Sequence, residues 1–362
     1  MQRKQQVTLQ EIGRAAGVSA PTVSRVLNRH PGVSGEVRSR VMEAIEALGY
    51  DAEPILRKAA VISNAQMHEK RIEIVMFPLP EQNDIFKLSY FNEIYEGCLS
   101  VLSQSGTARA SLLTWERSWR GTADLPETVL KRFRKADGLL LIGSSFPQAV
   151  RELKRLNRAI VAIGMGTASD SLDYVSHNDF QAGQVLADYL IDRGCVEIGF
   201  FSGSRHSECF TARLNGVMVQ ALHRLGEKSF SCRYADSTDN KDVMETLAAW
   251  LDSGKCPRTL VFSHFVAAYV FYNLLVHRGL KPDRYNIATF DAESDFIPGM
   301  VFTSMETFPR QLGFKAAGRV LQLIARPPEA EMPQSILVPC RLKPGNTVRA
   351  VPERREATGN IS

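Results

Sequence analysis

The sequence predicts a small all-α helix-turn-helix domain followed by a two-lobed α/β domain with parallel sheets. Two observations carry this prediction. The whole net charge of +5 lies in the first forty residues, which hold seven Lys or Arg and two acids and also carry the cap pattern of short helices. From residue 71 onward, short apolar runs alternate with amphipathic segments, as strands and helices do in parallel sheets covered on both faces.

Composition excludes several classes of protein. The sequence has no run of about eighteen apolar residues, so we do not expect a membrane-spanning helix. The polar start MQRKQQVTLQ lacks an apolar signal core, which indicates a cytoplasmic protein. Six cysteines are scattered without a C-x-x-C pair, which indicates reduced packing thiols and neither a zinc site nor a disulfide framework.

The first two helices of the basic head (residues 1–50) can be read from their caps. Thr8 can cap a helix, and Glu11 three residues later completes a capping box. Gly17 ends that helix, because glycine tolerates a positive φ. Ser19 is the next N-cap, and Pro21 falls in the first turn, where a missing N–H costs nothing.

A third helix follows the break HPGVSGE. Ser34 caps it, it runs to about Leu48, and Gly49 stops it. Apolar residues at helical spacing give each helix an inner face; they are Leu9, Ile12, Ala15 and Ala16 in the first helix, Val23, Val26 and Leu27 in the second, and Val37, Val41, Ile45 and Leu48 in the third.

Three short helices, the first two joined by a tight glycine turn, predict a helix-turn-helix that binds double-stranded DNA. The second helix lies in the major groove in this motif, so the candidates for base reading are Ala20, Pro21 and Arg25, of which Arg25 can donate two hydrogen bonds to guanine. The candidates for phosphate contact and positioning are Thr8, Ser19, Thr22, Ser24, Asn28, His30, Ser34 and Arg38. The alternatives are a solvated basic tail and a small bundle for protein contacts.

Three short runs of residues in the head resemble a known protein family. The run AGVSAPTVSRVLN, the following PGVS and the final ALGY resemble the N-terminal domain of the LacI/GalR family of transcription regulators. The resemblance implies a homodimeric, repressor-type protein that binds a pseudo-palindromic operator and whose body binds a small effector.

The hinge departs from the family pattern. After the tyrosine the family continues x-P-N-x-x-A-R-x-L, and its leucine wedges into the minor groove. Here the sequence is YDAEPILRKAA, in which Arg57 matches the arginine but Ala59 stands where the leucine is expected. Alanine is too short to wedge well between base pairs, so we expect a weaker kink, or one shifted to Leu56.

The body is predicted to be two α/β lobes. Its apolar runs are IEIVMF, ASLLTW, GLLLIG, AIVAIG, EIGFFSG, TLVFS, NIATFD and MVFTS, and helical stretches lie at 92–104, 125–135, 180–193, 209–225, 241–252, 265–278 and 308–325. The body resembles, more weakly than the head, the effector domain of the same family, which is of the periplasmic binding protein type I-like fold. The predicted parts are a helix-turn-helix domain at 1–50, a hinge and linker at 51–70, an effector and dimerisation domain at 71–345 and a flexible tail at 346–362. The first lobe covers 71–177 and 306–328, and the second covers 178–305 and 329–345.

The resemblance also implies the effector site. Ligands of open α/β sheets bind beyond the carboxyl ends of the strands, which puts the site between the two lobes. The matching positions are Tyr90, Phe91, Asn178, Asp179, Arg213, His264 and Asp291. Because His264 and Phe265 replace the family's usual Asn-Asp pair, we expect an atypical effector. A sugar, sugar acid, sugar phosphate or nucleobase fits an arginine, an aspartate and aromatic rings, and for each residue ordinary surface or core packing is the alternative.

Other signals are weak. IGMGTAS lacks a G-x-G-x-x-G between a strand and a helix, so we expect no dinucleotide cofactor. His206 and Glu208 have no further ligand placed by sequence, which disfavours a metal. FSGSRHS is not a G-x-S-x-G elbow, which disfavours a hydrolase. The tail has no leucine heptads, so we expect dimers and not tetramers. The rival functions are a sugar-binding transport protein and an α/β enzyme.

Overall fold

The computed structural model describes residues 7–27, 33–48, 50, 69–77, 89–116, 118–119, 121–143, 147–157, 159–164, 172–205, 207–292, 297–325 and 332–350. The chain divides into two compact units, Met1–Glu69 and Lys70–Ser362. The predicted hinge residues Leu56, Arg57 and Ala59 lie outside the described residues. Among the described residues, no helix is both long and apolar enough to cross a membrane.

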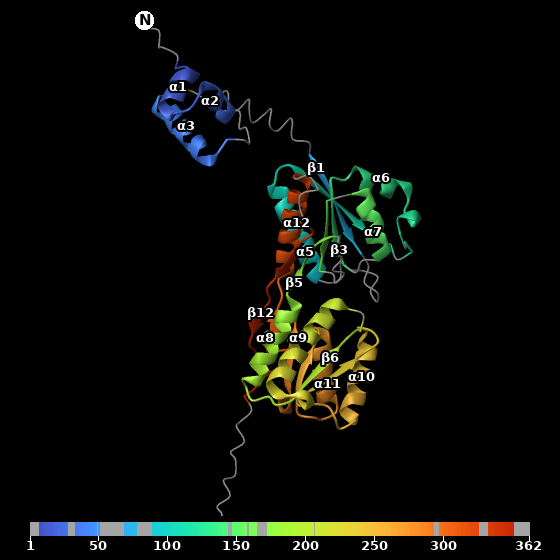
Figure 1. Cartoon of the computed structure of the whole chain (residues 1–362). Coiled ribbons are helices and arrows are strands. Elements are labelled where there is room, and N and C mark those ends of the chain that lie inside the picture. The colour runs from blue at the N-terminus through green and yellow to red at the C-terminus, as the bar shows by residue number, and fades with distance from the viewer. Residues whose placement is uncertain are drawn as a thin grey trace, which may run out of the picture. The chain divides into compact units, whose positions relative to one another are not determined.

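The described part of the first unit contains the helices α1 (Leu9–Ala16), α2 (Ala20–Leu27) and α3 (Gly35–Ala47), which are labelled in Figure 1. The predicted capping box is present: the Thr8 N–H donates to Glu11 Oε2 at 2.7 Å, and the Glu11 N–H donates to Thr8 Oγ1 at 3.4 Å. Ser34 Oγ accepts the Val37 N–H at 3.4 Å at the start of α3. The cap pattern therefore predicted the beginnings of these helices correctly.

A tight turn joins α1 to α2. Gly17 has a φ of 67°, the left-handed conformation that glycine adopts without strain. Gly13 is equally constrained, because a Cβ there would lie 2.7 Å from the carbonyl oxygen of Val18. The Val18 N–H donates to the Gly13 carbonyl at 2.8 Å. The turn therefore brings α2 directly against the end of α1.

The core of the head is formed by one face of each helix, made of Ile12, Ala16, Val23, Val26, Leu27, Val41, Ala44 and Ile45. Two predicted core residues are wrong: Ala15 is exposed on α1, where Ile12 and Ala16 form the buried face, and Leu48 is 39% exposed. The helix α3 ends at Ala47, and Leu48 lies beyond it as the C-cap. Ala44, which is buried beside Ile45, occupies the inner face in its place.

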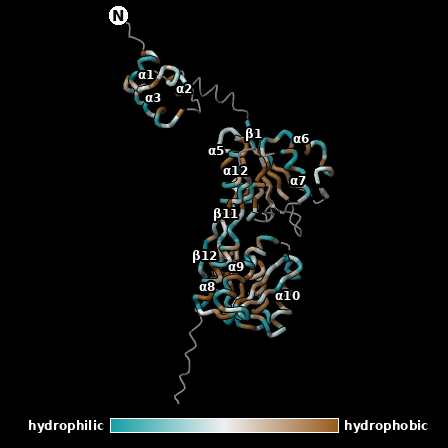
Figure 2. The backbone as a smooth tube through the Cα atoms, in the orientation of Figure 1, coloured by the Kyte–Doolittle hydropathy of each residue, from teal (hydrophilic) through white to brown (hydrophobic). Residues whose placement is uncertain are grey.

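The first lobe of the second unit is a six-stranded parallel sheet in the order β11-β5-β4-β3-β1-β2. Its strands are β1 (Lys70–Met76), β2 (Ala108–Thr114), β3 (Gly138–Ile142), β4 (Ile160–Ile163), β5 (Asp173–His177) and β11 (Ser335–Val338). One face is covered by α5 (Ser89–Gln104) and α12 (Pro309–Ala325), the other by α6 (Glu127–Lys135) and α7 (Pro147–Leu156). The central strands are brown in Figure 2, as expected for strands buried on both faces.

The second lobe repeats this plan with the order β12-β10-β9-β8-β6-β7, in which only the β10–β12 pair is antiparallel. Its strands are β6 (Ile198–Ser202), β7 (Phe230–Tyr234), β8 (Thr259–Phe262), β9 (Asn286–Phe290), β10 (Thr303–Glu306) and β12 (Arg341–Lys343). Its helices are α8 (Asp179–Ile191) and α9 (Glu208–Leu225) on one face, and α10 (Asn240–Asp252) and α11 (Phe265–His277) on the other. The described residues also include the single 3-10 turns η2 (Thr122–Asp124), η3 (Glu227–Ser229) and η4 (Pro282–Arg284).

The chain crosses between the lobes three times. The first crossing joins β5 to α8, and the second joins β10 to α12. The third crossing shows that one predicted boundary is wrong. Segment 329–345 was assigned to the second lobe, but β11 pairs with β5 in the first sheet, and only β12 belongs to the second sheet. The third crossing is therefore the short link between Val338 and Arg341. The β11 strand has only four residues, SILV, and so short an apolar run does not show which of the two sheets it joins.

Each lobe contains one pair of helices in close contact. In the second lobe a Cβ on Gly216 of α9 would overlap the carbonyl oxygen of Phe180 on α8, and Gly183 faces the backbone of α9 in the same way. In the first lobe Gly97 of α5 and Gly313 of α12 face each other's helix backbones likewise. Because α8 carries Asp179 and α9 carries Arg213, this contact fixes the distance between two predicted site residues.

Candidate DNA interface and effector site

The residues predicted to read bases lie on the outer face of α2. Pro21 and Arg25 are exposed and are separated by four residues, so they share one side of the helix. Ala20 is half-buried at the start of the same helix. The opposite side of α2 is buried in the head core. The helix therefore presents one arginine and a small, unbranched surface to the outside.

Most of the residues predicted to contact phosphates lie at the starts of the three helices. The hydroxyls of Thr8 and Ser34 cap α1 and α3, so they fix the helix ends from which backbone N–H groups point outward. The hydroxyls of Ser19 and Thr22 lie 2.9 Å apart at the start of α2. Ser24 and Arg38 are half-buried. Asn28 and His30 lie outside the described residues.

In the second unit, an arginine is buried against two carboxylates. Arg213 is 3% exposed, and its Nε donates to Asp179 Oδ1 at 2.7 Å. Its Nη1 donates to Asp291 Oδ2 and to the carbonyl of Ser263, each at 2.8 Å. Burial opposes the charge, but the two carboxylates outweigh burial and raise the pKa of Arg213. The guanidinium is thus held ionised and rigid.

Asp291 occupies a strained position directly after β9. Its φ of 58° makes it the one residue other than glycine with a positive φ in the described part of the chain. The Thr307 hydroxyl donates to its Oδ1, and its Oδ2 accepts from Arg213. Its side chain stays 28% exposed. Strain of this kind concentrates at functional sites, because surrounding contacts must hold it.

A tyrosine of the first lobe reaches the same group. Tyr90, at the start of α5, lies with its hydroxyl 3.3 Å from His177 Nδ1. The Phe308 N–H donates to His177 Nε2 at 3.2 Å, so Nδ1 carries the proton and donates to the tyrosine. Burial raises the pKa of Tyr90, and the nearby carboxylate of Asp291 raises it further. His177, the last residue of β5 at the first crossing, therefore contacts both Tyr90 of α5 and the backbone of Phe308 at the second crossing.

A second histidine forms an aromatic platform. The His264 ring stacks on Phe210 at a centroid distance of 5.2 Å and an interplanar angle of 5°. Its Cε1 edge lies against Gly203, where a Cβ would overlap the ring. Its Nδ1 lies 3.0 Å from Ser263 Oγ. Burial, and then the charge of Arg213, lower the pKa of His264 to about 4, so the ring is neutral.

These residues form one group, which we name the inter-lobe cluster: Tyr90, His177, Asp179, Phe210, Arg213, Ser263, His264, Asp291 and Thr307. Of the predicted effector residues, two have mainly structural contacts. Asn178 caps α8 by accepting the Gln181 N–H, and Phe91 is 8% exposed in the first-lobe core. The sequence did not single out His177, Phe210, Ser263 or Thr307 for a site. For His177, Ser263 and Thr307 the signal that could have found them is their position at or directly after a strand end, whereas Phe210 lies in the first turn of α9.

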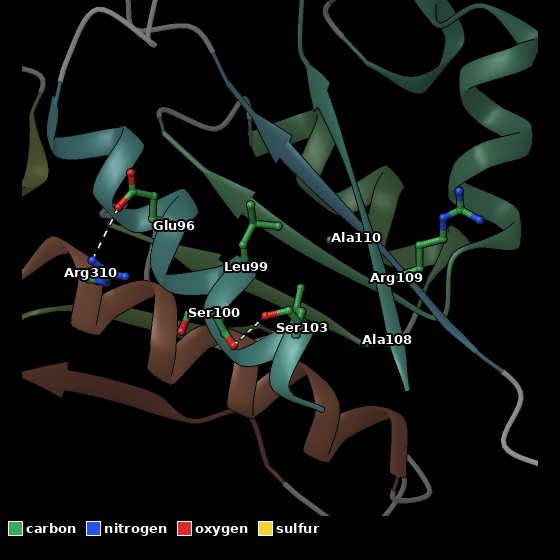
Figure 3. Close-up of a pocket in the computed structure, with 9 residues that line it drawn as sticks. Glu96, Leu99, Ser100, Ser103, Ala108, Arg109, Ala110 and Arg310 are labelled. Carbon is green, nitrogen blue, oxygen red and sulfur yellow. Dashed lines mark hydrogen bonds and ion pairs between the residues drawn. The ribbon is translucent and has the colours of Figure 1, made fainter. Parts of the chain in front are cut away.

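Other surface features carry less chemistry. Among the residues that the structure describes, no three His, Cys, Asp or Glu side chains are arranged to hold a metal ion. A groove of about 620 Å³ lies between α5, β2 and the start of α12 (Figure 3). Small and aliphatic side chains such as Leu99, Ala108 and Ala110 line it, with the Arg310–Glu96 ion pair at one end. The inter-lobe cluster is therefore the better candidate for a polar ligand.

Two family models match the chain, one on each unit. The model of bacterial regulatory proteins of the lacI family matches residues 8–53. The periplasmic binding protein-like domain matches residues 187–348. The order of the two domains and the geometry of the head agree with this pairing.

The head is similar to the lacI family of bacterial regulatory proteins, and the body to periplasmic binding protein-like domains.

The repressor PurR of Klebsiella pneumoniae is 31% identical over 214 residues, which is 58% of each chain. The chain thus spans a little more than half the length of that relative. Among solved structures, a complex of the transcriptional regulator CelR with cellobiose has a TM-score of 0.62 at 20% identity and covers 94% of this chain and 99% of its own.

The Lac repressor dimer bound to operator and an anti-inducer is equally similar. Its TM-score is 0.62 at 20% identity, and the match covers 96% of this chain and all of the other. Similarity at this level of identity establishes the fold, and it confirms the predicted head and two-lobed α/β body.

Proposed function

We propose that this protein is a sequence-specific DNA-binding transcriptional repressor whose operator affinity is switched by a small carbohydrate-type effector bound between the two lobes. The observation that carries the proposal is the pairing of a basic helix-turn-helix, with Arg25 exposed on α2, and a two-lobed body that buries an arginine between two carboxylates. The similarity to the repressor PurR and to the regulator CelR, solved in complex with cellobiose, supports it.

In this proposal two heads of a homodimer bind a pseudo-palindromic operator, each reading one half-site. Arg25 donates to guanine in the major groove, and the capped starts of α1, α2 and α3 contact phosphates. The excess positive charge of the head supplies most of the affinity. Binding should therefore weaken steeply as salt concentration rises.

The switch lies at the crossings between the lobes. An effector that contacts Tyr90 from one lobe and Asp291 from the other changes the angle between them. His177 transmits this change, because it bonds Tyr90 and also the Phe308 N–H at the second crossing. Coupling between two sites of this kind is typically about 1–3 kcal/mol.

Selection of bound sequences from a random DNA library tests the proposal. The full chain should enrich an inverted repeat, whereas a transport protein or an enzyme should enrich none. The matched control is Arg25→Ala beside Arg14→Ala, since both remove one positive charge from the head. We expect Arg25→Ala to relax one position of each half-site and Arg14→Ala to keep the sequence. Absence of any enriched repeat with the unmodified chain would overturn the DNA-binding proposal.

A further inference from the structure

One edge of the first-lobe sheet is strongly basic, although the body as a whole is neutral. The chain has a net charge of +5, and the first forty residues carry all of it, so the charges of the remaining residues balance. Within the body, however, the charge is unevenly distributed. We define the amino-edge patch as six exposed cations around the amino ends of the first-lobe strands: Arg71, Arg109, Arg134, Lys135, Lys154 and Arg155.

Two cations of the amino-edge patch lie side by side on neighbouring strands. Arg71 of β1 and Arg109 of β2 are register partners in a parallel pair. Successive residues of a strand point to opposite faces, and Glu73, two residues after Arg71, bonds Arg132 of α6. Arg71 therefore points to the face that α6 covers. Figure 3 shows the Arg109 side chain pointing away from α5, which covers the opposite face.

The other four cations end the two helices that cover this face. They are Arg134 and Lys135 in the last turn of α6 and Lys154 and Arg155 in the last turn of α7. Because α6 leads into β3 and α7 into β4, both helices end at the amino edge of the sheet. Asn157 joins the two ends, since its Nδ2 donates to the Ala136 carbonyl at 2.6 Å. The six cations therefore surround one edge of one sheet.

Nearby acids neutralise only part of this charge. Segments 69–73, 107–111, 127–137 and 147–157, which form this edge and its two helices, hold ten Lys or Arg and five acids. The acid closest to the strand ends is Asp137, and its Oδ2 already accepts the Arg71 N–H at 2.8 Å. The edge therefore keeps a clear excess of positive charge.

Helix stability explains the cations on the helices but not those on the strands. The helix dipole favours Lys and Arg in the last turn, which accounts for the four on α6 and α7. Strands have only a small net dipole, so Arg71 and Arg109 have no such stabilisation. Like charges on directly paired strand residues destabilise a sheet. Both arginines are exposed at this destabilising position, and a bound polyanion would offset their repulsion.

The chain enters the body at this same edge. The strand β1 begins at Lys70, and residues 51–69 connect it to the end of the head. A segment of this length extends at most about 70 Å, whatever its conformation. At 3.4 Å for each base pair, a head bound to its half-site keeps the edge within about 20 base pairs of that half-site.

We propose that the amino-edge patch binds phosphates of the duplex beside the operator, so that the body adds a sequence-independent DNA contact to the sequence-specific contact of the head. Exposed guanidinium and ammonium groups along one edge suit a row of phosphate oxygens, which carry no sequence information. This inference rests on the proposed function, because it requires a head bound to DNA. It adds that operator affinity depends on the length of the flanking duplex.

Operator fragments of two lengths test the inference with the full chain. One is the selected operator alone, and the other carries about 20 base pairs of unrelated sequence on each side. Extension should tighten binding of the unmodified chain, and the slope of log affinity against log salt should steepen by about 0.9 for each phosphate contacted. Arg71→Gln with Arg109→Gln should reduce that steepening by about 2 and leave affinity for the short operator unchanged.

Two further double variants accompany this test. The matched control is Lys281→Gln with Arg284→Gln, which removes two exposed cations of the second lobe. It should keep the affinity gain and the salt slope of the unmodified chain. Lys135→Gln with Arg155→Gln changes the helix ends and leaves the strands untouched, and it should reduce the gain from extension as the strand variant does.

Equal gains from extension in the unmodified chain and in both patch variants would overturn the inference. Tight binding of the short operator would then leave the proposed function standing. Equal losses of affinity for the short and the extended operator would overturn the inference too, because the substitutions would then act on the operator contact and not on flanking DNA. Failure of the unmodified chain to bind either fragment would refute the proposed function itself.

Discussion

Replacing His264 by glutamine should change how the stability of the protein depends on pH. The imidazole is buried between Gly203 and Phe210, and its pKa is lowered to about 4 from an ordinary value of 6.5. At pH values between these two pKa values, the imidazole is protonated in the unfolded chain and neutral in the folded chain. The stability conferred by the neutral ring is therefore complete above pH about 6.5 and is lost as the pH falls toward about 4.

The magnitude follows from the two pKa values. Each unit of pKa difference corresponds to about 1.4 kcal/mol, and at pH about 5 the folded ring is still largely neutral while the unfolded one is charged. Lowering the pH from about 7.5 to about 5 should thus cost the unmodified protein about 2 kcal/mol at His264 alone. Glutamine does not titrate, so the variant should lack this part of the pH dependence.

Urea unfolding of both proteins at the two pH values measures the effect. Every other titrating group is common to both chains, including His177, whose pKa burial also lowers. Its contribution cancels in the difference between the two chains. The difference in pH dependence should be about 2 kcal/mol, with the unmodified protein losing more stability at low pH. Parallel pH profiles would refute the buried, neutral state of His264.

Three further predictions concern the head, the helix pair and the crossings. Arg25→Ala should weaken binding to the selected operator by about 1–3 kcal/mol and random DNA by less, in fluorescence anisotropy titrations; equal losses would make Arg25 a phosphate contact. Gly216→Ala should destabilise the second lobe by about 1–3 kcal/mol or more, because the added Cβ would overlap the backbone of Phe180. An unchanged midpoint of urea unfolding would contradict that contact. His177→Ala should lower the melting temperature, because the Phe308 N–H loses its acceptor, and well below that temperature it should reduce release of the operator by the effector; full release would exclude its role in coupling.

The head could be predicted almost completely from its sequence. Its helices begin at Thr8, Ser19 and Ser34, whose side chains satisfy backbone donors locally, and such local hydrogen bonds depend on only three or four consecutive residues. Leu48 was assigned wrongly, since periodicity alone does not tell where the last turn of a helix ends.

The body could be predicted in outline only. Longer apolar strands such as β3 were visible, whereas the four residues of β11 are too few to tell which sheet they join. The partners of Arg213 come from α8, from the ends of β8 and β9 and thus from distant parts of the chain. Which of them meet depends on tertiary packing, including the glycine contact between α8 and α9, and not on local pattern.

The most direct test of the proposed switch is a pair of equilibrium titrations with the selected operator and a sugar that binds the full chain. Operator affinity is measured with and without the sugar, and sugar affinity with and without the operator. Because coupling between two sites is reciprocal, both affinities should fall by the same factor, about 5- to 150-fold. Operator affinity that is the same with and without a saturating sugar would contradict the account.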